Sequence, residues 1–152
     1  MFWSIELTAH PVRRLVDAYG HLIDGSVTEG AVFVFTSASY SITRLITGQL
    51  DCHVDIGHRL LTDQPWMLAE FLHVGRGKVA CLFPYDVAAA VFIAEKAGAT
   101  ITDAYGQRLH DLLLVTEKRI DQQFSLVAAS TSVLHRLVLD SLIWPPTANP
   151  AC

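Results

Sequence analysis

Charged residues are scarce in this chain. Only 17% of its 152 residues are Asp, Glu, Lys or Arg, whereas globular domains ordinarily carry about 25%. Hydrophobic residues make up 51%, and the formal net charge is −4. No basic stripe with interleaved aromatic residues occurs, which argues against nucleic-acid binding. A chain this apolar is expected to bury surface against another copy of itself, against a separate polypeptide or against a missing part of the same protein.

Long apolar runs and paired cysteines are also lacking. No apolar run approaches the ~18 residues of a membrane span, and the start Met1 to Glu6 lacks the basic region of a signal peptide. We therefore expect a soluble, cytoplasmic protein. Cys52, Cys81 and Cys152 are odd in number and too scattered for a metal knuckle or a disulfide framework. We interpret them as core or incidental thiols.

The sequence contains no complete phosphate-binding glycine motif. The segment GRGK (residues 75–78) suggests a phosphate loop, but Val79 follows the lysine and the long glycine spacing is absent. No glycine-rich fingerprint follows an expected strand, so a generic nucleotide-binding α/β domain ranks third among the functions considered. His53 and His58 are too isolated to indicate a zinc site.

Residues 83–98 predict one helix with both ends marked. Pro84 cannot continue a strand ladder, Asp86 stands where an N-cap carboxylate would accept the first free amides, and Gly98 suits the position after the helix. The residues between them are apolar until Glu95. A helix that is apolar on every side must be covered on every side. The sequence therefore predicts a layered α/β fold with this helix buried at its centre.

Asp86 has two interpretations on spacing alone. The residue three positions later is Ala89, so no reciprocal capping box forms and one carboxylate oxygen is free to face outward. Such a carboxylate can be a plain cap, or it can hold a divalent cation that in turn holds a phosphate. The residues alone favour the plain cap, because Asp is among the commonest N-caps.

The segments YDVAAA (85–90) and IAEKAG (93–98) resemble the signature near the C-terminus of the inositol monophosphatase family, Trp-Asp-x-Ala-Ala-Gly or Ala followed by Glu-Ala-Gly. This family comprises magnesium-dependent phosphomonoesterases related in fold to fructose-1,6-bisphosphatase. The resemblance implies that Asp86 is a metal ligand. Tyr85 replaces the usual Trp and Lys96 a usual acidic residue, and neither change removes the ligand.

The segment TSAS (36–39) resembles the Gly-Ser-x-Ala segment of the same family, with Thr36 in place of the glycine. The resemblance implies that Ser37 and Ala38 lie near substrate hydroxyls. The residues alone favour a different interpretation, in which these hydroxyl side chains cap a helix from about Ser39 to Thr47.

Residues 49–56 alternate strictly between polar and apolar, as in a half-buried strand with Asp51, His53 and Asp55 on its wet face. The segment 48–55 also matches the spacing of the family motif Gly-x-x-Asp-x-Tyr-x-Glu. The resemblance implies that Asp55 accepts hydrogen bonds from substrate hydroxyls.

The other segments have simpler patterns. Residues 2–7 suggest an opening strand or irregular edge, and 12–23 have the spacing of an amphipathic surface helix. Asp24-Gly25-Ser26 is interpreted as a turn, because its match to the family's Asp-Pro-Ile-Asp-Gly-Thr loop fails on inspection. We further expect a strand covered on both faces at 31–35, two later strands at 99–103 and 124–129, and a last helix at 133–142. An insertion is expected at 57–78. It contains a helix at 65–72 with exposed aromatics, which could act as a lid or subunit contact.

The resemblance covers 31–142 and makes the single domain 1–152 look like the C-terminal half of an inositol monophosphatase or sugar phosphatase, with a mixed sheet. It implies Mg²⁺ as cofactor and an inositol or sugar phosphate as ligand. Most metal ligands of the family come from its N-terminal half, from a Glu and the Asp-Pro-x-Asp-Gly-Thr loop, and neither occurs here. We therefore predict little or no phosphatase activity of this chain alone, and either a complementing N-terminal half or a homo-oligomer. The alternative is a non-catalytic interaction module.

Overall fold

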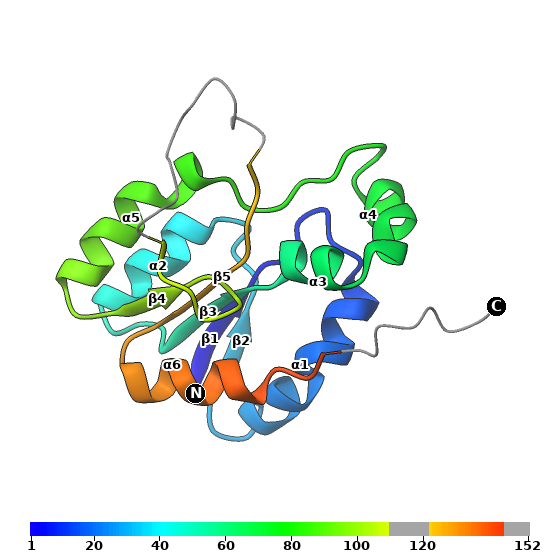
Figure 1. Cartoon of the computed structure of the whole chain (residues 1–152). Coiled ribbons are helices and arrows are strands. Elements are labelled where there is room, and N and C mark those ends of the chain that lie inside the picture. The colour runs from blue at the N-terminus through cyan, green and yellow to red at the C-terminus, as the bar shows by residue number, and fades with distance from the viewer. Residues whose placement is uncertain (110–121, 145–152) are drawn as a thin grey trace.

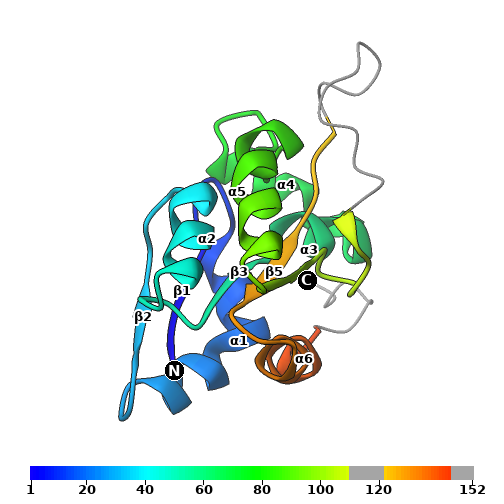
Figure 2. The same cartoon turned by 90° about the vertical axis from the view of Figure 1, so that its left-hand side faces the viewer.

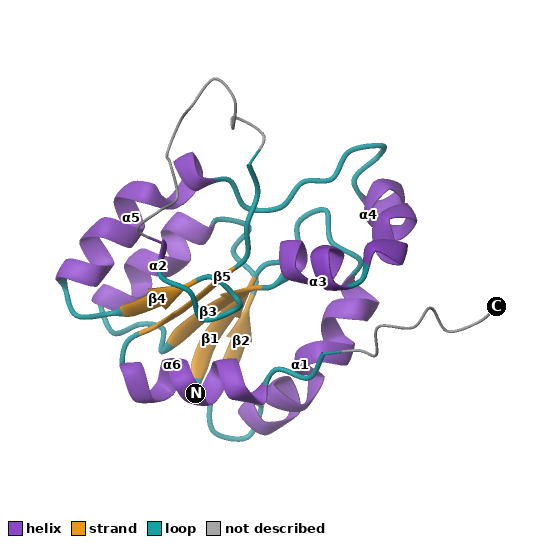
Figure 3. Cartoon of the chain, in the orientation of Figure 1, coloured by secondary structure: helices purple, strands orange, loops and turns teal. Residues whose placement is uncertain are grey.

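Five strands form one mixed sheet in the computed structural model, which describes residues 1–109 and 122–144 (Figures 1 and 3). The strand order is β2-β1-β3-β5-β4. β1 (Phe2–Ile5) lies parallel to both β2 (Ala31–Phe33) and β3 (Cys52–Asp55). β5 (Leu126–Ala129) is antiparallel to β3, and β4 (Thr100–Thr102) is antiparallel to β5. The predicted mixed sheet is confirmed.

Helices cover both faces of this sheet (Figures 1 and 2). α1 (Val12–Ser26) and α6 (Ser132–Ser141) pack in one hydrophobic core, and α2 (Ala38–Ile46) and α5 (Pro84–Lys96) pack in another. Alternate residues of β5 enter different cores, with Val127 in the first and Leu126 in the second. The predicted layered α/β architecture is confirmed.

α5 is covered on one side only. Val87, Ala90, Val91 and Ala94 are buried at helical spacing, whereas Phe92 is 62% exposed. The expectation that this helix is covered on every side is therefore wrong for the part of the chain that the structure describes. The sheet and α2 contact only one side of the helix, and no other described element lies over its outward side.

β3 is buried on both faces, so the predicted wet face is wrong. His53 and Asp55 are each 1% exposed, because the α2–α5 layer covers the side that the alternation assigned to solvent. The imidazole Nδ1 of His53 lies 2.9 Å from the hydroxyl of Ser4 on the neighbouring strand.

Two elements near the N-terminus differ from the expected ones. Asp24-Gly25-Ser26 is the last turn of α1 and not a separate turn. Ser26 holds it there, because its hydroxyl accepts a hydrogen bond from Trp3 Nε1 at 2.8 Å and donates one to the Leu22 carbonyl at 2.6 Å. β2 is an edge strand with only intermediate burial, and not a strand covered on both faces.

Residues 57–78 fold as three short helices, α3 (Gly57–Asp63), the 3₁₀ helix η1 (Pro65–Met67) and α4 (Leu68–Val74). The predicted exposed aromatics are wrong, since Phe71 is fully buried in a small core with Met67 and Trp66 packs against that core.

The later predicted strands are present with shorter bounds as β4 and β5, and the predicted last helix is present as α6, which begins and ends one residue earlier. Thr131 caps α6, and its hydroxyl accepts a hydrogen bond from the amide of Leu134 at 3.2 Å. Cys52 and Cys81 are buried free thiols, whereas Cys152 lies outside the described residues. Among the helices that the structure describes, none has the length and apolarity needed to cross a membrane.

Candidate functional site

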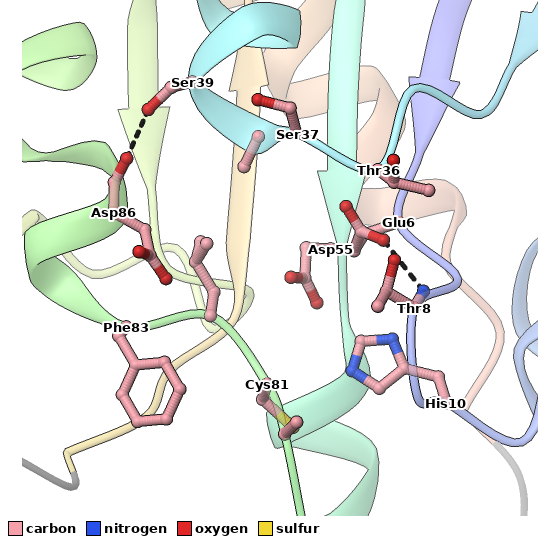
Figure 4. A pocket seen from close by; sticks show the side chains of 13 residues that line it. Glu6, Thr8, His10, Thr36, Ser37, Ser39, Asp55, Cys81, Phe83 and Asp86 are labelled. Carbon is pink, nitrogen blue, oxygen red and sulfur yellow. Dashed lines mark hydrogen bonds between the residues drawn. The ribbon is translucent and has the colours of Figure 1, made fainter. Parts of the chain in front are cut away.

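A cavity of about 350 Å³ lies where three parallel strands end (Figure 4). Glu6 follows β1, Ser37 lies four residues beyond β2, and Asp55 is the last residue of β3. Because β1, β2 and β3 run in the same direction, their carboxyl ends meet at one edge of the sheet. This edge is where α/β sheets bind ligands, and all three residues line the cavity.

Two helices begin at the same cavity. The N-cap of α2 is Ser37, whose hydroxyl accepts a hydrogen bond from the amide of Tyr40 at 3.3 Å. α5 begins at Pro84, and the hydroxyl of Ser39 donates to the main-chain carbonyl of Asp86, which joins the two helix starts. Free amides and the helix dipole make such ends attractive to anions. The predicted capping role of the Ser/Thr cluster is confirmed for Ser37.

Asp86 is the third residue of α5, so the plain N-cap interpretation is wrong. The N-cap position is Phe83, and no side chain makes a capping hydrogen bond there. The helix begins earlier than expected because Pro84 has a backbone φ suited to the first helical position. Asp86 is exposed and lines the cavity, and Figure 4 shows its carboxylate directed into the open space and away from Ser39.

Asp55 lies at the bottom of the cavity with half of its hydrogen-bonding capacity unused. Its Oδ1 accepts a hydrogen bond from the amide of Gly57 at 3.1 Å, whereas the buried Oδ2 has no partner in the described residues. Burial raises the pKa of Asp55 to about 7, the Gly57 amide opposes this and the carboxylate of Glu6 adds to it. Near neutral pH the Asp55 side chain can therefore either accept or donate a hydrogen bond.

Sequence reasoning missed three titratable residues of the cavity wall, Glu6, His10 and Cys81. The Oε1 of Glu6 accepts hydrogen bonds from the amides of Leu7 and Thr8 at 3.0 and 2.8 Å. Burial raises the pKa of Cys81 to about 12, so its thiol stays protonated at neutral pH and is no nucleophile. Glu6 lies directly after a strand, which is a common position for a site residue. That signal could be used only with the knowledge that β1 lies parallel to both β2 and β3.

Thr36 has a strained backbone at the cavity wall. Its φ is 52°, in the left-handed region that β-branched residues avoid. Thr36 stands where the motif that this segment resembles carries glycine, the residue that adopts positive φ without steric cost. Ser37 and Ala38 follow directly and line the cavity together with Asp55 and Asp86. The tertiary structure thus brings all four residues singled out in the sequence to one site.

The described residues contain no group of three or more His, Cys, Asp or Glu side chains placed to hold one metal ion. Asp86 and Glu6 line the same cavity, but they do not form a complete metal centre with a further neighbour. A metal at this cavity would therefore need ligands in addition to those that the described residues bring together.

Comparison with known proteins finds that part of the chain is similar to a phosphatase. No protein-family model matches the chain. A stretch of 63 residues is 41% identical to the chloroplastic bifunctional phosphatase IMPL2 of Arabidopsis thaliana, covering 41% of this chain and 18% of that protein.

Solved structures of inositol monophosphatases share the fold. A Pyrococcus horikoshii protein with similarities to inositol-1 monophosphatase has a TM-score of 0.57 and 21% identity, over 92% of this chain and 42% of its own. Inositol monophosphatase II of Staphylococcus aureus has a TM-score of 0.54 and 15% identity, over 90% and 39%. SaIMPase-II with inositol monophosphate bound also has a TM-score of 0.54. The chain thus spans about two fifths of the length of these structures.

Proposed function

Because this chain resembles the C-terminal half of an inositol monophosphatase-family protein in sequence and fold, we propose that it supplies substrate and metal contacts to a magnesium-dependent phosphomonoesterase of inositol or sugar phosphates. One observation carries the proposal. Asp86, Asp55, Ser37 and Ala38 line a single cavity at the carboxyl ends of parallel strands and at the starts of two helices.

The charge of the cavity supports a cation-dependent mode of phosphate binding. Its described lining includes the carboxylates of Glu6, Asp55 and Asp86 and no Lys or Arg. These carboxylates would repel a phosphate dianion, even though two helix N-termini attract it. A divalent cation beside Asp86 would offset that repulsion, and oxygen ligands suit Mg²⁺.

In this proposal each residue has one task. Asp86 is a metal ligand and holds the phosphate through the cation. Ser37 and Ala38 lie against the substrate hydroxyls, and Asp55 accepts hydrogen bonds from them. When bound, magnesium polarises the phosphate and activates a water molecule.

A separate polypeptide completes the metal centre in this proposal. The described residues do not bring three metal-binding side chains together, and this chain spans only about two fifths of the length of the related structures. α2 and α5, which contact one another, expose five large apolar side chains, namely Tyr40, Ile46, Tyr85, Phe92 and Ile93. Full burial of such a side chain contributes about 1.5–3 kcal/mol. We assign this apolar helix surface to the polypeptide equivalent to the remaining part of the related structures.

The test is a complementation assay. The chain is mixed with a polypeptide that carries the Asp-Pro-x-Asp-Gly-Thr loop, and phosphate release from myo-inositol 1-phosphate is measured at millimolar magnesium. We expect release by the mixture only. The variant Asp86→Asn should lower the rate about 100-fold or more, because loss of a metal ligand removes several kcal/mol of transition-state stabilisation.

The matched control is Asp24→Asn, because Asp24 is an exposed carboxylate on α1 outside the cavity. This variant should release phosphate at the wild-type rate. Equal rates for Asp86→Asn and wild type would contradict the metal-ligand role.

The second candidate is a non-catalytic interaction module, favoured by the exposed apolar surface of α2 and α5. It predicts that the complex forms but releases no phosphate in any combination. Light scattering of the purified chain, with and without the second polypeptide, separates a homo-oligomer from a mixed complex.

A further inference from the structure

His10 lies in the cavity wall, and its ring has no hydrogen-bond partner among the described residues. It belongs to the loop between β1 and α1, and its side chain is 1% exposed. Neither Nδ1 nor Nε2 of its ring makes a hydrogen bond within the described residues. Most buried polar atoms in proteins are paired. Two unpaired nitrogens on one ring beside a cavity therefore indicate a place where a polar group of a ligand binds.

Two neighbours hold the imidazole in position. The ring of Phe71 meets it edge-on, with 5.7 Å between the ring centroids and 69° between the planes. On another side lies Gly57, where an added Cβ would stand 2.2 Å from Nε2. The preceding residue, Ala9, has a φ of 57°, in the left-handed region. Strain of this kind persists only where the surroundings enforce it, so the loop aims His10 at a fixed place.

The charge state of His10 suits a neutral ligand group. Burial lowers its pKa, although Glu6 partly opposes this, so the ring is neutral at pH 7. A neutral imidazole offers one donor and one acceptor. A hydroxyl group can use either of them, whereas a phosphate dianion offers only acceptors and could use only the donor. Figure 4 shows His10 on the same side of the cavity as Asp55 and across from Asp86. The Oδ2 atom of Asp55 also has no hydrogen-bond partner in the part of the chain that the structure describes.

We propose that His10 is a specificity-determining residue that hydrogen-bonds a hydroxyl of the substrate while a second hydroxyl pairs with Oδ2 of Asp55. This inference rests on the proposed function and refines it. The ligand is then a polyol phosphate with at least two free hydroxyls remote from the phosphate. The phosphate lies at the Asp86 side, near the helix starts.

Binding of myo-inositol to the full chain tests this assignment without any phosphate chemistry. We expect His10→Phe to raise the Kd about tenfold, as for the loss of one hydrogen bond to a buried group. The phenyl ring still fills the space between Phe71 and Gly57, so the melting temperature should not fall. His10→Gln should restore most of the affinity, because an amide keeps a donor and an acceptor. His21→Phe is the control, since His21 is exposed on α1.

Nitrogen NMR of the histidine rings gives a second readout. Saturating myo-inositol should shift the His10 ring nitrogens in the wild type, whereas a purely structural imidazole would not respond. Equal affinities of wild type and His10→Phe would overturn the inference, and so would a wild-type chain that binds no myo-inositol. Magnesium-dependent phosphate release in the complementation assay would still leave the proposed function standing in either case.

Discussion

Two buried ionisable residues on β3 have opposite pKa shifts. Burial lowers the pKa of His53 to about 4 and raises that of Asp55 to about 7. Folding therefore disfavours the charged form of each. At pH values between the folded-state and unfolded-state pKa of His53, the unfolded chain binds more protons at this residue than the folded chain, so stability rises with pH. Between the corresponding pKa values of Asp55 the unfolded chain binds fewer protons, so stability falls with pH. The two contributions partly cancel in the wild type.

Asp55→Asn should remove one of these contributions. The measured quantity is the free energy of unfolding of the variant minus that of the wild type. This difference is expected to increase as the pH rises from about 4 to 7, because only the folded wild type must ionise a buried carboxyl group in this range. The raised pKa corresponds to about 2–4 kcal/mol. Urea denaturation at a series of pH values measures this difference.

Asn is a matched replacement because its carbonyl oxygen can still accept the hydrogen bond from the Gly57 amide. A difference that stays constant over this pH range would show that Asp55 titrates as an ordinary exposed carboxylate.

The helices α2 and α5 serve two purposes at the scale of the element. Their first residues line the cavity, and their buried sides form one hydrophobic core with the sheet. Their outward sides expose large apolar residues, among them Phe92 and Ile93. A stable helix needs only one buried side, so α5 folds within this chain and still presents apolar surface to a partner.

Phe92→Glu should prevent assembly without unfolding the chain. The substitution puts a carboxylate where the proposed partner buries an aromatic ring, and we expect the Kd of the complex to rise 10- to 100-fold or about 1.5–3 kcal/mol. The new carboxylate stands one turn before Lys96, a spacing that supports an isolated helix. Size-exclusion chromatography with the second polypeptide, together with circular dichroism, measures both effects.

Val133→Glu is the control, because Val133 is 76% exposed on α6, across the sheet from α5. Unchanged assembly of Phe92→Glu, or an equal loss in both variants, would mean that the partner does not dock on α5.

The whole molecule combines an acidic cavity with an apolar helix surface. The described residues hold no group of three or more His, Cys, Asp or Glu side chains placed to bind a metal ion, and the chain spans about two fifths of the length of the related structures. Metal binding and assembly are therefore coupled in the proposed function. Neither component of the complex would be active without the other.

Magnesium should stabilise the complex and leave the chain alone unaffected. A ligand that binds the folded state raises its stability, so the melting temperature of the complex should rise at millimolar magnesium and fall again with a chelator. The chain alone should melt at the same temperature with and without magnesium. A clear magnesium-dependent increase for the chain alone would show that it holds the ion by itself, contrary to the expected sharing of ligands.

Local signals in the sequence predicted much of the fold. Gly98 follows α5 with positive φ, and Ser37 caps α2, because capping acts within a single helical turn. Some errors arose where a tertiary contact outweighed a local preference. Ser26 extends α1 through Trp3, which is 23 residues away, and a turn was expected there.

The amino-acid order alone determined the alternation of β3, the apolar pattern of α5 and the motif resemblance around Asp86, since these depend on neighbours within a few residues. Tertiary structure decided that Glu6 and His10 join Asp55 and Asp86 at one cavity, and that His53 is buried. These outcomes depend on which strands lie side by side and what covers them. Ser4 and His53, 49 residues apart, are hydrogen-bonded neighbours only because β1 and β3 run parallel.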